Sequence, residues 1–160
     1  LTRVVGALLA LFRSGADLQW QTLDLQTLLA RLPHDDLAVQ VPPGATLQAD
    51  ADLLTAALIN LLDNAVRHGA SQLQMSVSTQ GGLQHLHLHD NGRGTLPERR
   101  AELADALASQ AYEGRMGLGL MLADLVARAH GGRLWLPAVD SGFAVELQLG
   151  LPDPPTPPER

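Results

Sequence analysis

The stretch LINLLDNAVRH, from Leu58 to His68, lies in a longer apolar segment and carries two asparagines four residues apart. Asparagine forms helices poorly, because its side chain competes for backbone hydrogen bonds. Apolar residues nevertheless recur here at helical spacing: Leu54, Leu58, Leu61, Leu62 and Ala65. This pattern predicts a helix from about Asp52, as its N-cap, to His68, ended by Gly69, with one face against a core.

A second, polar stripe runs beside the apolar one and consists of Asn60, Asn64, Arg67 and His68. Amide oxygens can ligate a hard cation such as Mg²⁺, and a guanidinium suits phosphate oxygens. For this helix alone, an ordinary solvated face is the more common explanation of a polar stripe. The stripe is therefore a candidate site that needs support from elsewhere in the chain.

Composition limits the class of protein. The 160 residues suffice for one domain with its own core, and a hydrophobic content of 46% argues against disorder. The net charge of -6 argues against nucleic acid or an anionic membrane as the main partner. The chain has no cysteine, which excludes disulfides and thiolate metal sites and is compatible with a reducing cytosol. No apolar run approaches the roughly 20 residues of a membrane span.

The order of expected elements indicates the fold class. We expect helices near residues 1–13, 24–32, 52–68, 98–107 and 116–130, and strands near 37–42, 45–50, 71–80, 83–90, 133–139 and 143–150. Adjacent strands joined by short turns, such as Gly81-Gly82, indicate a largely antiparallel sheet. The helices must then cover one face of it, which gives a two-layer α/β sandwich.

The two ends of the chain differ from the middle. Residues 1–13 have helical apolar spacing, which fits either a helix folded onto this domain or the last turns of a longer helix. Because the chain starts at Leu1 rather than Met, we interpret it as a piece of a longer protein. Residues 151–160 are rich in proline and are expected to be unstructured or polyproline-like.

The segment HLHLHDNGRG, residues 85–94, predicts a carboxylate at the edge of the core. Side chains alternate along a strand, so Leu86, Leu88 and Asp90 share the inner face. A carboxylate there needs a donor, and Gly92 and Gly94 let the backbone turn and a ligand approach closely. Asp90 could accept a hydrogen bond from an exocyclic amine such as that of adenine. An Asx-type turn that caps the strand end is the alternative.

Three histidines, His85, His87 and His89, share the opposite face of that strand and suggest a metal site. Residues two apart on a strand are separated by about 6.6 Å, which is wide for ligands of one ion unless the side chains converge. We therefore interpret these histidines as a solvated sheet face.

The segment GRMGLGLMLADLV, residues 114–126, predicts a helix that starts in glycines. A helix N-terminus with free N–H groups is an anion site, and Gly117 and Gly119 would let phosphate approach. The spacing of a Rossmann fingerprint and the Gly-Lys-Ser/Thr of a Walker A loop are both absent. Glycines that serve only packing are the alternative.

Taken together and in this order, the three segments resemble the ATP-binding catalytic domain of bacterial sensor histidine kinases, within the gyrase, chaperone, kinase and mismatch-repair ATPase superfamily. NLLDNAVRH is similar to the N box, DNGRG to the G1 box, and GLGL before a helix ending in HGG to the G2 box. The resemblance runs from about Asp17 to Leu149 and implies the Bergerat-type ATP-binding fold over residues 17–150.

For the polar stripe, the resemblance implies a metal and phosphate site. Asn64 would be the principal Mg²⁺ ligand with Asn60 beside the same ion, and Arg67 and His68 would reach the phosphates of ATP. The hydrolysing ATPases of the superfamily carry Glu where Asn60 stands. Because an amide cannot accept a proton from water, the resemblance implies that the γ-phosphate passes to a histidine instead.

For the remaining positions, the resemblance implies contacts to the base and a mobile lid. Asp90 would bind the adenine amine, and Ser141 would lie near the adenine. Residues Thr95 to Met116 would form the ATP lid. Backbone positions that shape the pocket and lid would be Gly92, Gly94, Gly117, Leu118 and Gly119.

The chain departs from the family pattern in three places. None of its six histidines lies in a phosphoacceptor context, and residues 1–16 are similar only to the end of the dimerisation helices that would carry one. The aromatic box of the lid is missing, with Tyr112 as its single aromatic residue. Arg115 stands where the first glycine of the G2 box is usual, which puts nucleotide affinity in question.

The resemblance also implies partners and a location. We expect a separate dimerisation and phosphoacceptor domain, a response regulator downstream, and a homodimeric full-length protein attached to the inner membrane with this domain in the cytoplasm. Two alternatives stay open: a degenerate nucleotide-binding fold that serves as a docking module, and a serine kinase of the anti-sigma type.

Overall fold

The computed structural model describes residues 18–34 and 36–152. The helix expected over residues 1–13, the division of the chain at residue 16 and most of the proline-rich tail lie outside these ranges. Within them the elements are β1 (Trp20–Asp24), α2 (Leu25–Ala30), β2 (Ala38–Gln40), β3 (Thr46–Asp50), α3 (Ala51–Arg67), β4 (Gln72–Gln80), β5 (Leu83–Asp90), α4 (Pro97–Ser109), α5 (Leu118–Ala129), β6 (Arg133–Trp135) and β7 (Phe143–Gly150).

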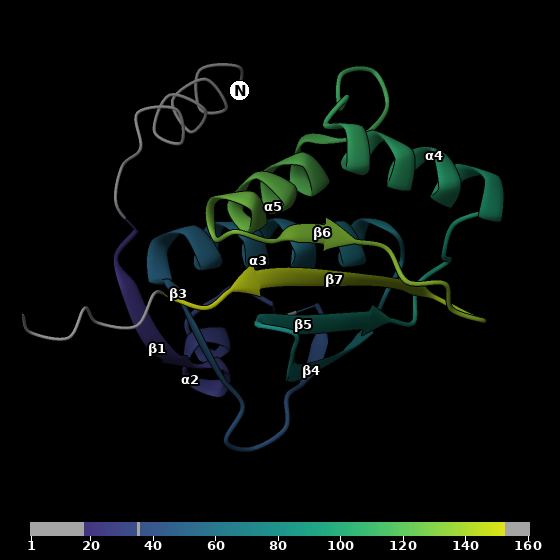
Figure 1. The fold of residues 1–160 in the computed structure, drawn as a ribbon. Helices are drawn as coiled ribbons and strands as arrows, with labels where there is room; N and C mark the ends of the chain where they lie inside the picture. Colours follow the sequence, from purple (N-terminus) through teal and green to yellow (C-terminus); the bar gives the residue numbers. More distant parts are fainter. Residues whose placement is uncertain (1–17, 35, 153–160) are drawn as a thin grey trace, which may run out of the picture.

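The main sheet has five strands in the order β2-β4-β5-β7-β6. In Figure 1 four of them run from β6 at the top to β4 at the bottom, with α3 behind the sheet. The expected α/β sandwich is confirmed, with one difference at its edge: β2 pairs with β4 in parallel, so the sheet is mixed. β1 and β3 form a separate antiparallel pair beside it.

The hairpin of β4 and β5 shows why the sheet has its register. Gly81 and Gly82 both have positive φ, 59° and 78°, as a two-residue turn between twisted strands requires. Along β5 every second residue is buried, and Leu86 and Leu88 face the core. The histidines between them lie on the outer face, as the alternation predicted.

Helix α3 supplies much of the core through its buried stripe, and the predicted stripe is confirmed in full: Leu54, Leu58, Leu61, Leu62 and Ala65. The predicted cap was wrong. Asp50, not Asp52, is the N-cap, because its Oδ1 accepts the N–H groups of Asp52 and Leu53 at 3.1 Å each. Asp52 instead lies in the first turn, where its charge complements the helix dipole. The helix ends before Gly69, which has φ +81°.

Two buried polar side chains tie the small sheet to the rest of the molecule. Gln84, on the inner face of β5, accepts the N–H of Gln48 and donates to the Gln48 carbonyl, both at 2.8 Å. The Gln84 amide thereby makes with Gln48 the two hydrogen bonds that the backbone of a neighbouring strand would make, and so links the two sheets. The imidazole of His130, at the end of α5, accepts the N–H of Asp50 at 3.0 Å.

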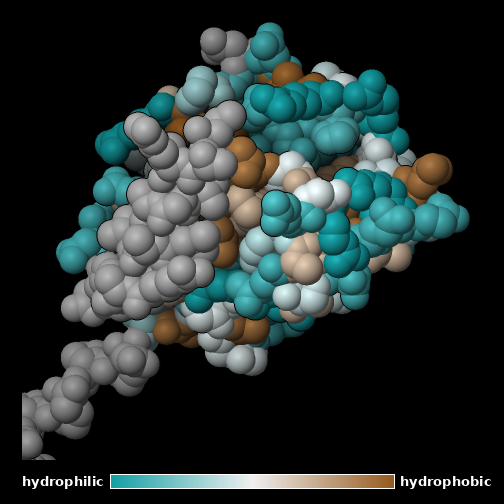
Figure 2. All heavy atoms as spheres, turned by 90° about the horizontal axis from the view of Figure 1, so that it is seen from above, coloured by the Kyte–Doolittle hydropathy of each residue, from teal (hydrophilic) through white to brown (hydrophobic). Residues whose placement is uncertain are grey.

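The face of the molecule seen in Figure 2 mixes hydrophilic and hydrophobic side chains. Figure 2 shows hydrophobic side chains in several separate patches between hydrophilic ones. Within the described part of the chain, no helix combines the length and the hydropathy needed to cross a membrane.

Candidate functional site

The predicted site residues of α3 and α5 meet in one cleft of about 610 Å³. Helix α3 forms one wall, the start of α5 the second, and α4 with the loop before it the third. The lining residues are Asn60, Asp63, Asn64, Arg67, His68, Thr95, Arg99, Leu103, Gly117, Leu118, Gly119, Leu120 and Phe143. Seven of these residues were predicted as site residues from two separate segments of the sequence: Asn60, Asn64, Arg67, His68, Gly117, Leu118 and Gly119.

On the α3 wall, the amide of Asn60 is oriented by its own helix. Its Nδ2 donates to the carbonyl of Ala56 at 2.7 Å, which leaves Oδ1 as an acceptor. A Cβ placed on Gly119 would lie 3.8 Å from that oxygen, so the start of α5 passes close to Asn60. The side chain of Asn64 makes no hydrogen bond with any other described residue. Both amides are thus available to a ligand in the cleft.

Arg67 lies at the rim of the same wall. Its Nε pairs with Asp63 Oδ2 at 2.9 Å, one helical turn back. Both side chains are more than half exposed, at 77% and 57%, so this pair contributes at most about 1 kcal/mol and can rearrange toward an anion.

The start of α5 has the properties of an anion site. Gly117 is its N-cap, and no side chain of the described residues caps the helix there. The first N–H groups of α5 are therefore free to bind a ligand, and the helix dipole favours negative charge at this end. No atom lies within 4 Å of the Cβ that Gly117 would carry, so the space beside the backbone is open.

The third wall adds a cation that sequence reasoning missed. Arg99 projects from α4 into the cleft lining, about half exposed and within 3.3 Å of Glu102. Nothing in its spacing distinguished it from Arg100, because the choice depends on how α4 is rotated over the cleft. Phe143, at the start of β7, was missed for the same reason.

Asp90 ends β5 with its carboxylate turned inward and only 6% exposed, as predicted. Its Oδ1 accepts the N–H groups of Gly92 at 2.8 Å and of Phe143 at 3.2 Å. Its Oδ2 accepts no hydrogen bond from the described residues. Asp90 does not itself line the cleft, but Phe143, which holds it, does.

The turn after Asp90 is fastened to the end of α3. The N–H of Arg93 donates to the carbonyl of His68, and its guanidinium donates to the carbonyl of Arg67, both at 2.9 Å. A Cβ on Gly92 would lie 2.7 Å from the same His68 oxygen. Gly94, with φ +74°, lies close to Gly142 rather than in the cleft lining. These two glycines therefore permit the close approach of the turn to its neighbours.

Asn91, which was not among the predicted site residues, holds the other side of this turn. Its Oδ1 accepts the N–H groups of Ser71 and Gln72 at 2.8 and 2.9 Å. The turn is therefore held on both sides, and Asp90 is placed by backbone groups rather than by a partner charge.

Ser141 is not brought into the cleft. It lines a different hollow of the surface together with His89, whose Nε2 lies 2.8 Å from the Ser141 carbonyl. That Ser141 lies near the adenine of ATP thus stays a prediction.

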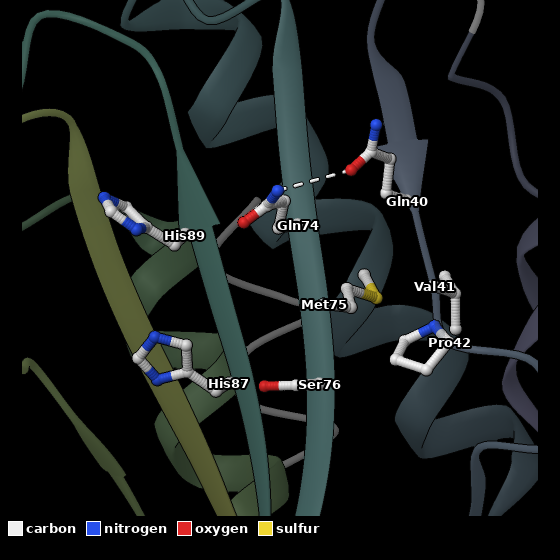
Figure 3. A pocket seen from close by; sticks show the side chains of 8 residues that line it. All are labelled: Gln40, Val41, Pro42, Gln74, Met75, Ser76, His87 and His89. Carbon is white, nitrogen blue, oxygen red and sulfur yellow. Dashed lines mark hydrogen bonds between the residues drawn. The ribbon is translucent and has the colours of Figure 1, made fainter.

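The outer face of the sheet carries the three histidines and a shallow depression of about 420 Å³ (Figure 3). His87 and His89 line it with Gln74, which bonds to Gln40 across the strands at 3.3 Å. None of the predicted cleft residues is there. Among the described residues, no three His, Cys, Asp or Glu side chains are grouped so that they could hold a metal ion.

His85 instead contacts Glu146 on the neighbouring strand. Burial raises the pKa of the Glu146 carboxyl, but its hydrogen bonds with His85 and Gln148 and the two nearby imidazoles outweigh this, so the pKa lies below its ordinary value. Glu146 is therefore ionised and links His85 of β5 to β7 on the outer face of the sheet.

The cleft as a whole suits a polyphosphate with a hard cation. It combines two guanidinium groups, two amides with free oxygens and an open helix N-terminus. Residues 49–153 match the family described as histidine kinase-, DNA gyrase B- and HSP90-like ATPase. The chain belongs to this family. The fold and function class that the resemblance implied are confirmed at this level.

Two curated relatives are sensor kinases. The chain is 37% identical over 123 residues to the sensor protein kinase CarS of Pseudomonas aeruginosa, covering 74% of this chain and 27% of that protein. It is 32% identical over 133 residues to the signal transduction histidine-protein kinase AfsQ2 of Streptomyces coelicolor, covering 81% and 25%. The chain thus spans about a quarter of the length of these relatives.

A solved structure agrees with this assignment. The ATP binding domain of PrrB from Mycobacterium tuberculosis is 28% identical, with a TM-score of 0.64 over 84% of this chain and 99% of that one. The likeness therefore extends over nearly the whole of that domain.

Proposed function

We propose that the cleft binds ATP with Mg²⁺ and presents the γ-phosphate to a histidine on a separate dimerisation domain of a two-component sensor kinase. The observation that carries this proposal is the meeting, in one cleft, of the amides of α3 and the uncapped start of α5. Neither feature alone distinguishes a ligand site from a polar surface.

Asn64, with Asn60, would hold Mg²⁺. The fit rests on Asn60, whose Nδ2 is engaged with its own helix so that its oxygen stays free for the ion. When bound, Mg²⁺ would neutralise phosphate charge. His68 would contribute a further contact to the phosphates. The N–H groups at Leu118 and Gly119 would receive them at the start of α5, with Arg67 and Arg99 adding positive charge.

Transfer rather than hydrolysis is expected, because the position that holds a general-base Glu in the hydrolysing ATPases of the superfamily is occupied here by Asn60. Asn60 stands where a general base would be needed, and an amide cannot accept that proton. Catalysis would then consist of positioning the γ-phosphate and neutralising its charge.

Asp90 would recognise the base. Its Oδ1 is occupied by two backbone donors, and its Oδ2 remains as an acceptor for an exocyclic amine. Gly92 and Gly142 let the backbone on both sides approach Asp90 closely, and Gly94 in turn lies against Gly142.

The rest of the protein is proposed from the relatives. Their names, sensor protein kinase and histidine-protein kinase, support a dimerisation and phosphoacceptor domain and a response regulator as partners. We extend the proposal to a homodimeric full-length protein attached to a membrane, with this domain on the cytoplasmic side.

Calorimetry with Mg·ATP tests the binding step. Wild type should bind, Asp90→Asn should weaken binding at least ten-fold, and Asn64→Ala should abolish its dependence on Mg²⁺. Asp90→Asn is a sharp test, because the new amide oxygen can keep both backbone bonds while the other acceptor becomes a donor. His87→Gln, on the outer sheet face, is the control and should leave affinity unchanged.

A wild-type chain that binds no nucleotide would overturn the proposal. For the transfer step, the chain is incubated with labelled ATP, with and without the dimerisation domain of its full-length protein. Acid-labile label on that domain, with phosphate release at background level without it, is the expected result. Rapid phosphate release by the chain alone would indicate a hydrolase instead.

A further inference from the structure

A buried polar network joins the lid to α5 and β6. Its centre is Asp124, which is 0% exposed although it is a carboxylate. Asp124 Oδ2 accepts the Tyr112 hydroxyl at 2.5 Å and Arg128 Nε at 2.9 Å, and its Oδ1 accepts the N–H of Leu134 at 3.0 Å. A buried carboxylate with three donors is fully satisfied, so the network is rigid and costly to break in part.

The same network holds the C-terminal end of α4. Arg128 Nη2 donates to the carbonyl of Leu107 at 2.7 Å. The buried residues of α4 are Leu103, at the middle of the helix, and Ala106 and Leu107 in its second half. The turn after the helix is fastened as well, since Arg115 donates to Asp105 Oδ2 at 2.8 Å.

The N-terminal half of α4 makes no described bond to this network, and its one bond to the turn after the helix is the longer one from Arg115 Nη2 to the Glu102 carbonyl, at 3.3 Å. The N-cap of α4, Leu96, makes no side-chain capping bond and is 73% exposed. The first six residues of the helix, 97–102, include none that is buried. Arg99, one of the two guanidinium groups of the cleft, lies in this loosely held half.

We propose that Tyr112 and Asp124 are positioning residues that latch the C-terminal half of the lid to α5, so that the lid opens at its N-terminal end. The proposal rests on the proposed function, because it gives the lid a cleft to close. Opening would carry Arg99 away from the phosphates, whereas Gly117 to Gly119 would stay in place for the next nucleotide.

The tyrosine is suited to a permanent latch. Burial, together with its hydrogen bond to Asp124, raises the pKa of the Tyr112 phenol to about 12. The hydroxyl therefore remains a donor at every physiological pH. Tyr112 is the single tyrosine of the chain, so its replacement can be followed without interference from another phenol.

Amide hydrogen exchange measured residue by residue, without nucleotide, tests the latch directly. In wild type, the amides of residues 101 and 102 should exchange at least ten-fold faster than those of 106–109. In Tyr112→Phe, exchange over residues 110–116 should rise at least ten-fold while β4 and β5 stay unchanged. Ser109→Ala removes a hydroxyl bond within α4 that lies outside the network and is the matched control.

Asp124→Asn is the second variant, because it keeps the size and one acceptor for Leu134 while losing the charge. A Tyr112→Phe lid that exchanges at the wild-type rate, or a rise that is equal throughout the chain, would overturn the latch. Mg·ATP affinity is measured in parallel and should fall three- to ten-fold in Tyr112→Phe. If wild type binds no nucleotide, the proposed function fails, whereas the exchange result still decides the latch.

Discussion

At the scale of single residues, the site depends on how closely the turn after Asp90 approaches the end of α3. Gly92→Ala would place a Cβ 2.7 Å from the His68 carbonyl and 3.1 Å from Asp90 Oδ1. Because the neighbours are backbone and a fixed carboxylate, we expect a loss of about 1–3 kcal/mol in the free energy of unfolding and weaker nucleotide binding. Urea unfolding and calorimetry measure the two effects.

Gly117→Ala is the matched control, since nothing lies within 4 Å of its Cβ and its φ is -74°. Its free energy of unfolding should stay within roughly 0.5 kcal/mol of wild type. Equal stability of the two variants would contradict the tight packing described for Gly92.

The part of the site that could be predicted is the part encoded within single segments. Asn60, Asn64 and Arg67 share a face by helical spacing alone, and the alternation of β5 turns Asp90 inward. Arg99 and Phe143 could not be predicted, because their approach to the cleft depends on the packing of α4 and β7. Ser141 was predicted only through the family resemblance and stays a prediction, since it lines a hollow with His89 outside the cleft lining.

At the scale of elements, the attachment of the small sheet to the main one depends on Gln84. Gln84→Ala would leave the N–H and carbonyl of Gln48 without partners in a partly buried site. An unmade buried hydrogen bond costs about 1–3 kcal/mol, so we expect a loss of that size in the free energy of unfolding. Gln80→Ala, an exposed glutamine at the end of β4, should cost little. An equal loss of unfolding free energy in the two variants would contradict a stabilising role for the Gln84–Gln48 hydrogen bonds.

The elements themselves followed from local patterns, and their pairings only in part. The β4–β5 hairpin was predictable because two glycines fix its turn, and the β6–β7 pair because the strands are close in sequence. The parallel pairing of β2 with β4 was not, because it joins strands on either side of α3. The N-cap of α3 was misplaced by two residues because Asp50 and Asp52 both suit a cap.

At the scale of the whole molecule, His130 joins elements that are far apart in the sequence. Its Nδ1 donates to the Val126 carbonyl at 2.8 Å and its Nε2 accepts the N–H of Asp50, so the folded protein needs a neutral ring. The ring of Trp20 lies edge-on at 5.2 Å, and the His130 carbonyl accepts the N–H of Gly150 at 2.7 Å. One residue thus connects β1, the end of β3, α5 and β7.

This arrangement predicts acid sensitivity. Burial lowers the pKa of His130 from its ordinary value of 6.5, outweighing the Val126 hydrogen bond and the nearby Asp50. As pH falls, His130 therefore binds a proton near pH 6.5 in the unfolded chain but only at a lower pH in the folded chain. The stabilising contribution of neutral His130 is complete above pH 6.5 and is lost as pH falls through the lowered pKa, with a slope of at most about 1.4 kcal/mol per pH unit. Urea unfolding from pH 8 to 5 should show this slope in wild type and a shallower one in His130→Gln. Equal slopes in the two proteins would place the acid sensitivity elsewhere.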